Sequence, residues 1–133
     1  MQLYLDTSAW LKRNYLERGS YQVRWFAGPN LLCGSPLGLI EVITEKYLQD
    51  WQTFVQLQVD FKVVDRAKDV ADRFALRGAD AVHFASLLLL AEDAARLGRE
   101  IIFLTSDREL LHTAMSVGIQ AMDPRSDQPP TVP

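Results

Sequence analysis

Short apolar runs alternate along the chain with longer segments of helical pattern, and this alternation constrains the fold more than any other feature of the sequence. The expected strands are, in chain order, 2–5, 31–33, 61–64, 101–104 and 119–122. The expected helices cover about residues 8–18, 21–27, 36–50, 51–58, 65–76, 79–97 and 106–117. Strands that alternate with helices are typical of a parallel sheet covered by helices on both faces. We therefore predict an α/β fold of three layers, α/β/α, with a central and mainly parallel sheet of four or five strands.

Size and composition indicate one globular domain. The chain has 133 residues, of which 48% are hydrophobic and 23% charged, enough for a substantial core. We expect the domain to span residues 1–123 and a disordered tail rich in Pro, Ser and Asp to follow at 124–133. A single cysteine, Cys33, excludes an internal disulfide and a multi-cysteine zinc site. It also fits a reducing compartment.

No feature of the sequence indicates secretion or a membrane span. The chain does not open with a basic segment followed by an apolar one. The longest apolar stretch, Phe84–Ala91, is too short to cross a bilayer. We therefore expect a cytoplasmic protein with no membrane partner.

Two carboxylates follow strands of the expected sheet. Asp6 comes directly after the first apolar run, and Asp107 comes shortly after the run at 101–104; each precedes a helix. The carboxyl ends of parallel strands meet at one edge of the sheet, which is where open α/β sheets bind their ligands. We therefore expect these two side chains to lie close together.

Two further acids, Glu41 and Asp80, belong to the same pattern. Glu41 lies in the second turn of the helix after strand 31–33 and is expected to point back toward the same edge. Asp80 shares a helical stripe with Phe84 and Leu87. Burying a carboxylate alone is costly, so an acid on an apolar stripe has to be paired, capped or bound to a metal.

Four converging acids without a cationic partner repel one another, and a divalent cation is the simplest remedy. Ligation by oxygen alone suits Mg²⁺ or Mn²⁺ rather than zinc. Such a site activates water and stabilises a phosphoryl transition state, most simply in the two-metal hydrolysis of a phosphodiester. The net charge of −3 argues against a protein that coats nucleic acid by charge alone, but not against a nuclease of this kind.

Each acid also has a purely structural interpretation. Asp6 or Thr7 fits the N-cap of the first helix. Asp107 follows Ser106, which fits a capping box completed by Glu109. Of the other two acids, Asp80 fits a first-turn acid that the helix dipole favours, and Glu41 fits a solvated helix residue. Taken singly, these interpretations are at least as good as a catalytic one, and only the joint placement of the four favours a site.

Four segments resemble the motifs of PIN domains, and most of all those of VapC-type toxins from bacterial and archaeal toxin–antitoxin pairs. The segments are Leu-Tyr-Leu-Asp-Thr-Ser-Ala at 3–9, Ser35 six residues before Glu41, Leu-Arg-Gly-Ala-Asp-Ala-Val-His-Phe-Ala at 76–85, and Phe-Leu-Thr-Ser-Asp at 103–107. They occur in the family's order and at similar spacing, and the similarity covers about residues 2–123. Each motif is weak alone, but four in order are fairly specific.

The resemblance implies a toxin that acts as a Mg²⁺- or Mn²⁺-dependent endoribonuclease with an RNA substrate. It also implies a homodimer and a cognate VapB-like antitoxin that holds the toxin inactive. The acids that it assigns to metal binding and catalysis are Asp6, Glu41, Asp80 and Asp107. In the same comparison Ser8 supports Asp6, and Thr105 or Ser106 orients a water at the metal.

Several other residues carry weaker signals. Glu45, one turn after Glu41, fits a surface acid better than a group that supports the metal ligands. His83 fits a buried, hydrogen-bonded histidine better than a base, and His112 a surface residue. The family often has an acid directly after its last motif Asp. Arg108 stands there in this chain, so Glu109 is interpreted as a capping partner rather than a fifth ligand.

Four basic residues near the acids are candidates for contacts with RNA phosphates, which set position rather than sequence preference. They are Lys12, Arg13, Arg77 and Arg108. For each of them alone, a solvated surface position is the simpler interpretation.

Two other functions are compatible with parts of the pattern. One is a PIN-like module that binds RNA or protein without cutting, which four intact acids argue against. The other is a haloacid-dehalogenase-like phosphatase. That chemistry needs a second Asp two residues after the first, where this chain has Ser8, and a late lysine, whereas no lysine follows Asp80.

Overall fold

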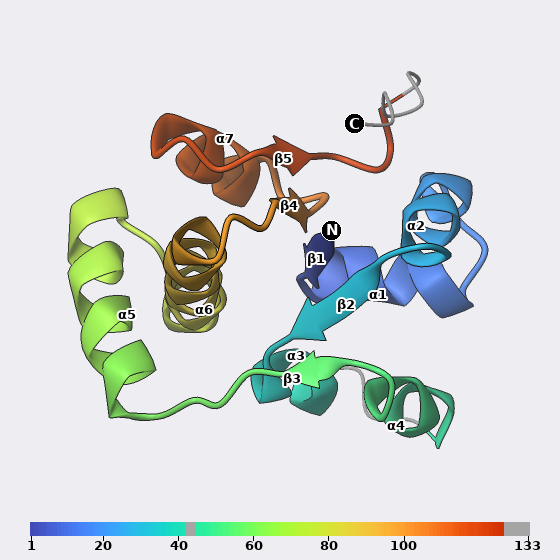
Figure 1. The fold of residues 1–133 in the computed structure, drawn as a ribbon, viewed down its shortest axis with the longest axis horizontal. Helices are drawn as coiled ribbons and strands as arrows, with labels where there is room; N and C mark the ends of the chain where they lie inside the picture. Colours follow the sequence, from blue (N-terminus) through green and yellow to red (C-terminus); the bar gives the residue numbers. More distant parts are fainter. Residues whose placement is uncertain (42–44, 127–133) are drawn as a thin grey trace.

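The computed structural model describes residues 1–41 and 45–126. Five parallel strands form one sheet in the order β3-β2-β1-β4-β5. The strands are β1 (Gln2–Leu5), β2 (Leu31–Gly34), β3 (Val55–Gln56), β4 (Ile101–Leu104) and β5 (Ala121–Met122). The helices are α1 (Thr7–Asn14), α2 (Ser20–Ala27), α3 (Pro36–Glu41), α4 (Glu45–Trp51), α5 (Phe61–Phe74), α6 (Gly78–Arg96) and α7 (Arg108–Ser116). Helices flank the sheet on both sides, which confirms the expected α/β/α fold (Figure 1).

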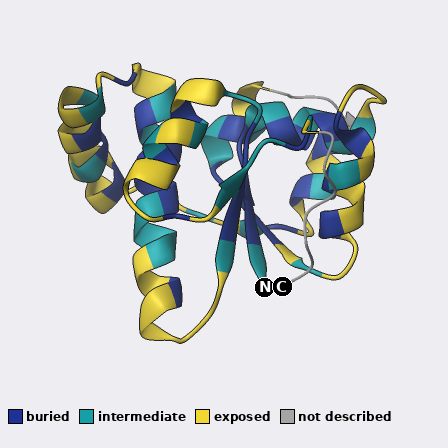
Figure 2. Cartoon of the chain, turned by 90° about the horizontal axis from the view of Figure 1, so that it is seen from above, coloured by how far each residue is buried: buried dark blue, intermediate teal, exposed yellow. Residues whose placement is uncertain are grey.

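The sheet is buried on both faces because its side chains alternate between two apolar layers. In β1, Leu3 and Leu5 pack on one side with α1, α2 and α4, whereas Tyr4 packs on the other side with α5, α6 and α7. The middle strands are accordingly buried along most of their length (Figure 2). This double burial explains why the strands read as continuous apolar runs rather than as alternating polar and apolar residues.

The long helix α6 lies between α5 and the sheet (Figure 1). Its residues His83, Phe84, Ala85, Ser86 and Leu87 are all buried in succession, which requires cover on more than one side. The prediction of a helix buried on several faces is thereby confirmed. Its first turn, at Gly78, lies at the carboxyl edge of the sheet, where Asp80 lines the same pocket as Asp6.

The prediction of a third strand at 61–64 is wrong, because these residues begin α5. The Asp60 carboxylate accepts a hydrogen bond from the Val63 amide over 3.1 Å and caps the helix. Val63, Ala67 and Val70 then form its buried face at helical spacing. The real third strand is the two-residue β3, which lies inside the segment predicted as helix 51–58.

Other element boundaries differ by a few residues. The first helix was expected at 8–18 but ends at Asn14, because Tyr15 is extended with φ −107° and ψ 137°. The helix expected over 36–50 is described as α3 and α4. Residues 42–44, including Ile43, which was expected to point inward, lie outside the described residues. The last strand begins at Ala121 rather than Ile119.

The described start of the expected tail packs on the domain. Pro124 is buried, and Arg125 donates a hydrogen bond to the Ser106 carbonyl over 2.7 Å. Residues 127–133 lie outside the described residues, so their disorder stays a prediction.

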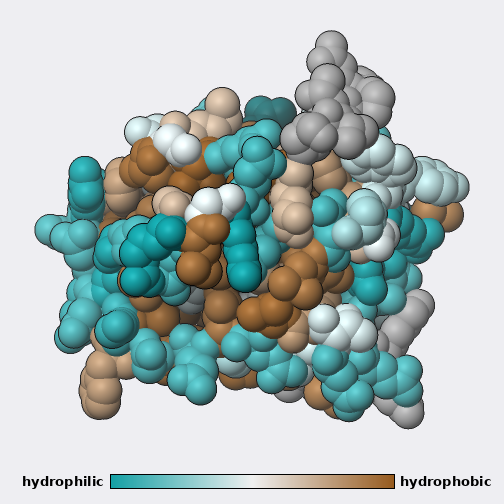
Figure 3. All heavy atoms as spheres, in the orientation of Figure 1, coloured by the Kyte–Doolittle hydropathy of each residue, from teal (hydrophilic) through white to brown (hydrophobic). Residues whose placement is uncertain are grey.

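The face seen in Figure 1 carries the N terminus, and the strands run away from it (Figures 1 and 2). Apolar side chains reach the surface in the middle of this face and are surrounded by polar ones (Figure 3). The carboxyl ends of the strands lie on the opposite side. In the described part of the chain no single helix is long and apolar enough to cross a bilayer, and α5 and α6, which reach that composition only as a pair, are bent by 113°.

Candidate active site at the carboxyl edge of the sheet

The site is built first by the ends of two neighbouring strands. Asp6 directly follows β1 and Thr105 directly follows β4, and these strands pair in parallel with Leu5 opposite Leu104. The Thr105 hydroxyl donates a hydrogen bond to Oδ2 of Asp6, although the two residues are 99 positions apart. The sheet topology therefore brings together the motif at 3–9 and the motif at 103–107.

Asp6 is both a helix cap and a buried acid of the site. Its side chain is 4% exposed, and Oδ1 accepts hydrogen bonds from Ser8 Oγ (2.7 Å) and from the Ala9 amide (3.0 Å), which caps α1. Burial raises the pKa of Asp6, while the hydrogen bonds from Thr105, Ser8 and Ala9 pull it partly back. The capping and the functional interpretations of this residue are thus compatible, because three donors favour its ionised form.

Glu41 ends α3 and is held by two donors on one oxygen. Thr7 Oγ1 donates to Glu41 Oε1 over 2.9 Å, and His83 Nε2 lies 3.1 Å from the same atom. The start of α3 packs close to these partners, since a Cβ built at Gly38 would lie 3.5 Å from the His83 ring and 3.8 Å from the Thr7 hydroxyl oxygen, at ordinary contact distance. The Glu41 side chain remains 40% exposed.

Asp80 lies in the first turn of α6, where the helix dipole favours a negative charge. Its carboxylate makes no hydrogen bond or ion pair within the described part of the chain. Burial raises the pKa of Asp80, the nearby charge of Asp107 raises it further, and His83 opposes the shift. The repulsion identifies Asp80 and Asp107 as neighbours at the edge of the sheet.

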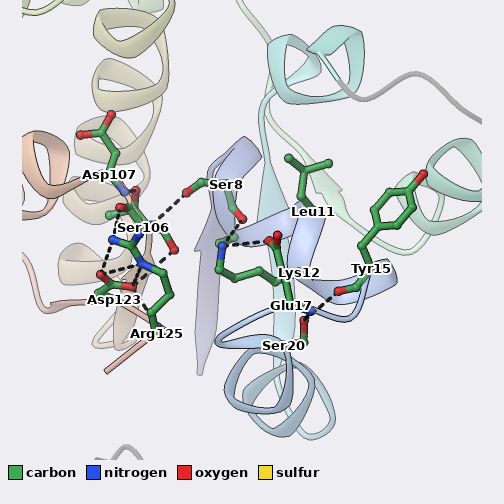
Figure 4. Close-up of polar contacts among 12 residues, drawn as sticks. Ser8, Leu11, Lys12, Tyr15, Glu17, Ser20, Ser106, Asp107, Asp123 and Arg125 are labelled. Carbon is green, nitrogen blue, oxygen red and sulfur yellow. Dashed lines mark hydrogen bonds and ion pairs between the residues drawn. The ribbon is translucent and has the colours of Figure 1, made fainter. Parts of the chain in front are cut away.

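Asp107 is the N-cap of α7, and the expected capping box is wrong. Its Oδ1 accepts hydrogen bonds from the amides of Glu109 (2.9 Å) and Leu110 (3.1 Å). Ser106 lies one residue before the cap, and its hydroxyl donates to Asp123 instead, over 3.3 Å. Arg125 binds the Ser106 carbonyl and Asp123 from the other side (Figure 4).

All four acids line one pocket of about 270 Å³ at this edge. The residues around it are Asp6, Thr7, Ser8, Leu11, Glu41, Asp80, His83 and Asp107. No lysine or arginine is among these lining residues. The four motif acids are therefore brought together in space, and none of the four forms an ion pair with an arginine in the described structure.

The donor set of this pocket fits a hard divalent cation. Oδ2 of Asp107, Oε2 of Glu41 and both oxygens of Asp80 accept no hydrogen bond from the described residues, so they are available as ligands. Carboxylate oxygens are the ligands that Mg²⁺ and Mn²⁺ prefer. Within the described residues no three His, Cys, Asp or Glu side chains already stand close enough to share an ion. Sharing an ion would thus require Asp80, whose carboxylate makes no hydrogen bond in the described structure, to turn toward Asp6 and Glu41.

Two of the four basic residues predicted near the site are committed to contacts within the protein. Lys12 is 6% exposed, and its Nζ is held by Glu17 Oε1 (3.0 Å) and the Ser8 carbonyl (3.3 Å) (Figure 4). Arg13 forms an ion pair with Asp50 over 2.8 Å. Arg77 and Arg108 are exposed, directly before α6 and at the start of α7. Of the four, these two keep exposed side chains on the elements that carry Asp80 and Asp107.

The structure adds residues that the sequence reasoning did not assign to the site. Thr7 binds Glu41, and Tyr4 contacts His83. The only sequence signal for either was its place in the first motif, because the partners lie on distant elements. The expectation of a buried, hydrogen-bonded His83 is confirmed, and His112 is exposed. The side chain of Glu45 lies outside the described residues.

Comparisons with known proteins support the fold. No family model matches the sequence, and no curated protein matches it. Among solved structures, a chain of a toxin–antitoxin complex from Klebsiella pneumoniae aligns with 92% of this chain and 97% of its own length, at 21% identity and a TM-score of 0.58. A chain of VapBC2 from Rickettsia felis, bound to a DNA fragment from its promoter, aligns at 12% identity over 92% and 98%, also with a TM-score of 0.58.

The chain has the fold of these toxin–antitoxin structures. The alignments cover nearly the whole of each protein, so the shared architecture is that of the complete domain and not of one motif. The expected PIN-like fold is thereby confirmed. Sequence identities of 21% and 12% support a shared fold and nothing more, so the function has to be argued from the site.

Proposed function

We propose that this protein is the toxin of a type II toxin–antitoxin pair and acts as a Mg²⁺- or Mn²⁺-dependent endoribonuclease. The observation that carries the proposal is the gathering of Asp6, Glu41, Asp80 and Asp107 around one pocket lined by no lysine or arginine. Acids without cationic partners are unfavourable together unless a cation joins them. The fold shared with toxin–antitoxin structures supports the same assignment.

The residues of the pocket have separable roles in this proposal. The four carboxylates hold the cation, which when bound supplies positive charge at the phosphoryl group and makes water more acidic. Ser8 and Thr105 each donate to one oxygen of Asp6 and favour its ionised form against the effect of burial. Arg77 and Arg108 are placed to bind the RNA backbone, since arginine recognises phosphate oxygens by charge-assisted hydrogen bonds.

The proposal includes a VapB-like antitoxin, a homodimeric state and a cytoplasmic location. A toxin that cleaves RNA has to be in the compartment that contains its substrate, and it has to be inhibited by an antitoxin while the cell grows. Light scattering of the purified protein, alone and with the product of an adjacent small reading frame, tests the first two.

The decisive experiment compares the wild type with Asp80→Asn. We expect the wild type to cleave RNA with Mg²⁺ or Mn²⁺, to lose activity with EDTA, and to arrest growth when expressed alone. Asp80→Asn should lower cleavage at least 100-fold and relieve the growth arrest while keeping the same circular dichroism spectrum, because Asp80 makes no hydrogen bond in the described structure. Equal cleavage by both proteins, or a wild type that binds RNA without metal-dependent cleavage, would exclude the nuclease and favour the binding module.

A further inference from the structure

Behind the acidic pocket, three side chains from three elements form a hydrogen-bonded chain. The Tyr4 hydroxyl of β1 lies 3.0 Å from Nδ1 of His83 in α6, and Nε2 of His83 lies 3.1 Å from Oε1 of Glu41 at the end of α3. Tyr4 and His83 are 0% and 3% exposed, whereas Glu41 opens to solvent. The chain therefore runs from the core to one acid of the pocket.

The direction of these hydrogen bonds follows from the chemistry of the end groups. An ionised carboxylate only accepts, so the hydrogen on Nε2 of His83 has to point at Glu41. A phenol carries its proton at neutral pH, so the buried Tyr4 hydroxyl can donate to Nδ1 over 3.0 Å. The Ser86 hydroxyl lies close enough to the Tyr4 hydroxyl to lower the pKa of the phenol against the effect of burial. The acceptor that the phenol contacts, at 3.0 Å, is Nδ1 of His83.

The same contacts determine which oxygen of Glu41 is left for a ligand. Both donors, Thr7 Oγ1 and His83 Nε2, reach Oε1. Oε2 accepts no hydrogen bond from the described residues. Because both contacts fall on Oε1, the carboxylate is fixed from one side only. Such a one-sided anchor orients a ligand while leaving its other oxygen open.

We propose that His83 is a positioning residue: its ring, oriented by the contact of Tyr4 with Nδ1, holds Oε1 of Glu41 through Nε2, so that the other oxygen of Glu41 stays turned toward a divalent cation. This inference rests on the proposed function and refines it. His83 touches neither the cation nor the substrate in this arrangement. It acts through Glu41.

Nitrogen-15 NMR of the wild-type imidazoles tests the tautomer without any substitution. The chain has two histidines, and the exposed His112 serves as the internal reference. At pH 7.5 we expect His83 to show a protonated Nε2 and an unprotonated Nδ1, and Tyr4→Phe to shift the Nδ1 resonance while leaving that of His112 unchanged. A His83 ring that carries no hydrogen on Nε2 overturns the proposal.

Binding of Mn²⁺ alone, measured by electron paramagnetic resonance, tests the consequence for the pocket. His83→Gln places an amide N–H near the position of Nε2, whereas His83→Leu removes every donor. We expect the dissociation constant of Mn²⁺ to rise about 10-fold or more in His83→Leu, the scale of losses when a residue that holds a metal ligand is removed. In His83→Gln and in the control His112→Gln it should stay within about threefold of the wild type. Equal weakening in both His83 variants, or none in either, overturns the positioning role.

The outcome for the wild type separates this inference from the proposed function. If the wild type binds Mn²⁺ and cleaves RNA but His83→Leu binds the ion equally well, only the role of His83 fails. If the wild type binds no Mn²⁺, the nuclease proposal fails together with the inference.

Discussion

The amide of Ser106 donates a hydrogen bond to Oγ of Ser8 over 2.9 Å, and this contact joins two loops that are 98 positions apart in the chain (Figure 4). Ser8 Oγ then donates to Oδ1 of Asp6. Thr105 repeats the arrangement, because its hydroxyl accepts from the Asp107 amide over 3.0 Å and donates to Oδ2 of Asp6. Each oxygen of Asp6 is therefore held by one hydroxyl, and each hydroxyl is held by the loop after β4.

Ser8→Ala should destabilise the protein and weaken RNA cleavage together. The substitution removes one donor to Asp6 and leaves the Ser106 amide without its acceptor. A partly buried unsatisfied amide costs about 1–2 kcal/mol of the free energy of unfolding. Urea denaturation measures this loss. The matched control is Ser116→Ala, which removes an exposed hydroxyl bonded only within its helix and should cost under about 0.5 kcal/mol. Equal effects of the two substitutions would contradict the linking role of Ser8.

Asp107→Asn and Asp107→Ala should separate capping from catalysis. Asparagine keeps a side-chain oxygen that can accept from the amides of Glu109 and Leu110, so the free energy of unfolding should change little. Alanine removes the cap and should cost about 1 kcal/mol. Both should lower metal-dependent RNA cleavage at least 100-fold, because both remove a ligand charge. If Asp107→Asn cleaves RNA as the wild type does, Asp107 is only a cap.

The contribution of Asp80 to the stability of the metal-free protein should fall as the pH rises from about 4 toward 7. Burial and the charge of Asp107 raise the pKa of Asp80 above its ordinary value of 3.8. A carboxyl group whose pKa is raised by folding stabilises the folded state below its unfolded pKa, and that contribution is lost as the pH passes the folded pKa. In EDTA, Asp80→Asn should therefore be more stable than the wild type at pH 7, by roughly 0.2–1 kcal/mol, and equal to it near pH 3. Thermal unfolding at several pH values measures the difference, and added Mn²⁺ should reverse its sign.

The sequence predicted the fold and the gathering of the four acids at one edge of the sheet, because both depend on local patterns. Buried strands β1, β2 and β4 are continuous apolar runs, and a short polar segment with Asp6 or Asp107 follows two of them. Strand β3 was missed because two residues leave no periodicity. The Phe-Lys-Val-Val run at 61–64 has strand composition, yet Asp60 caps a helix there and Phe61 stays 87% exposed.

The contacts that hold the acids in place could not be predicted from the sequence. The pairing of His83 with Glu41 depends on how α6 packs beside α3, and the pairing of Thr105 with Asp6 depends on strand order. A local sequence pattern determines neither the angle at which two helices pack nor the order of strands in a sheet. The burial of Lys12 was missed for the same reason, because its partner Glu17 lies beyond the end of α1, which was expected to continue to residue 18.

Gly19→Ala should disturb the C-terminal segment that supports Ser106. Gly19 has a φ of +95°, and a Cβ there would lie 2.7 Å from the carbonyl oxygen of Pro124. The left-handed backbone and the backbone clash together should cost roughly 2–4 kcal/mol. Gly98→Ala is the matched control, since its φ is +66° but a Cβ would meet no atom within 4 Å, and it should cost only about 1–2 kcal/mol.

The same substitution should raise the pKa of Asp123, which NMR titration can measure. Burial alone would raise this pKa, but the hydrogen bonds and the charge of Arg125 outweigh burial and lower it. Moving the backbone at Pro124 displaces Arg125, which also donates to the Ser106 carbonyl. In Gly19→Ala the pKa of Asp123 should therefore move up toward that of an ordinary aspartate, and in Gly98→Ala it should stay low. An unchanged pKa in Gly19→Ala would show that the Arg125 contacts do not depend on the packing of Gly19 against Pro124.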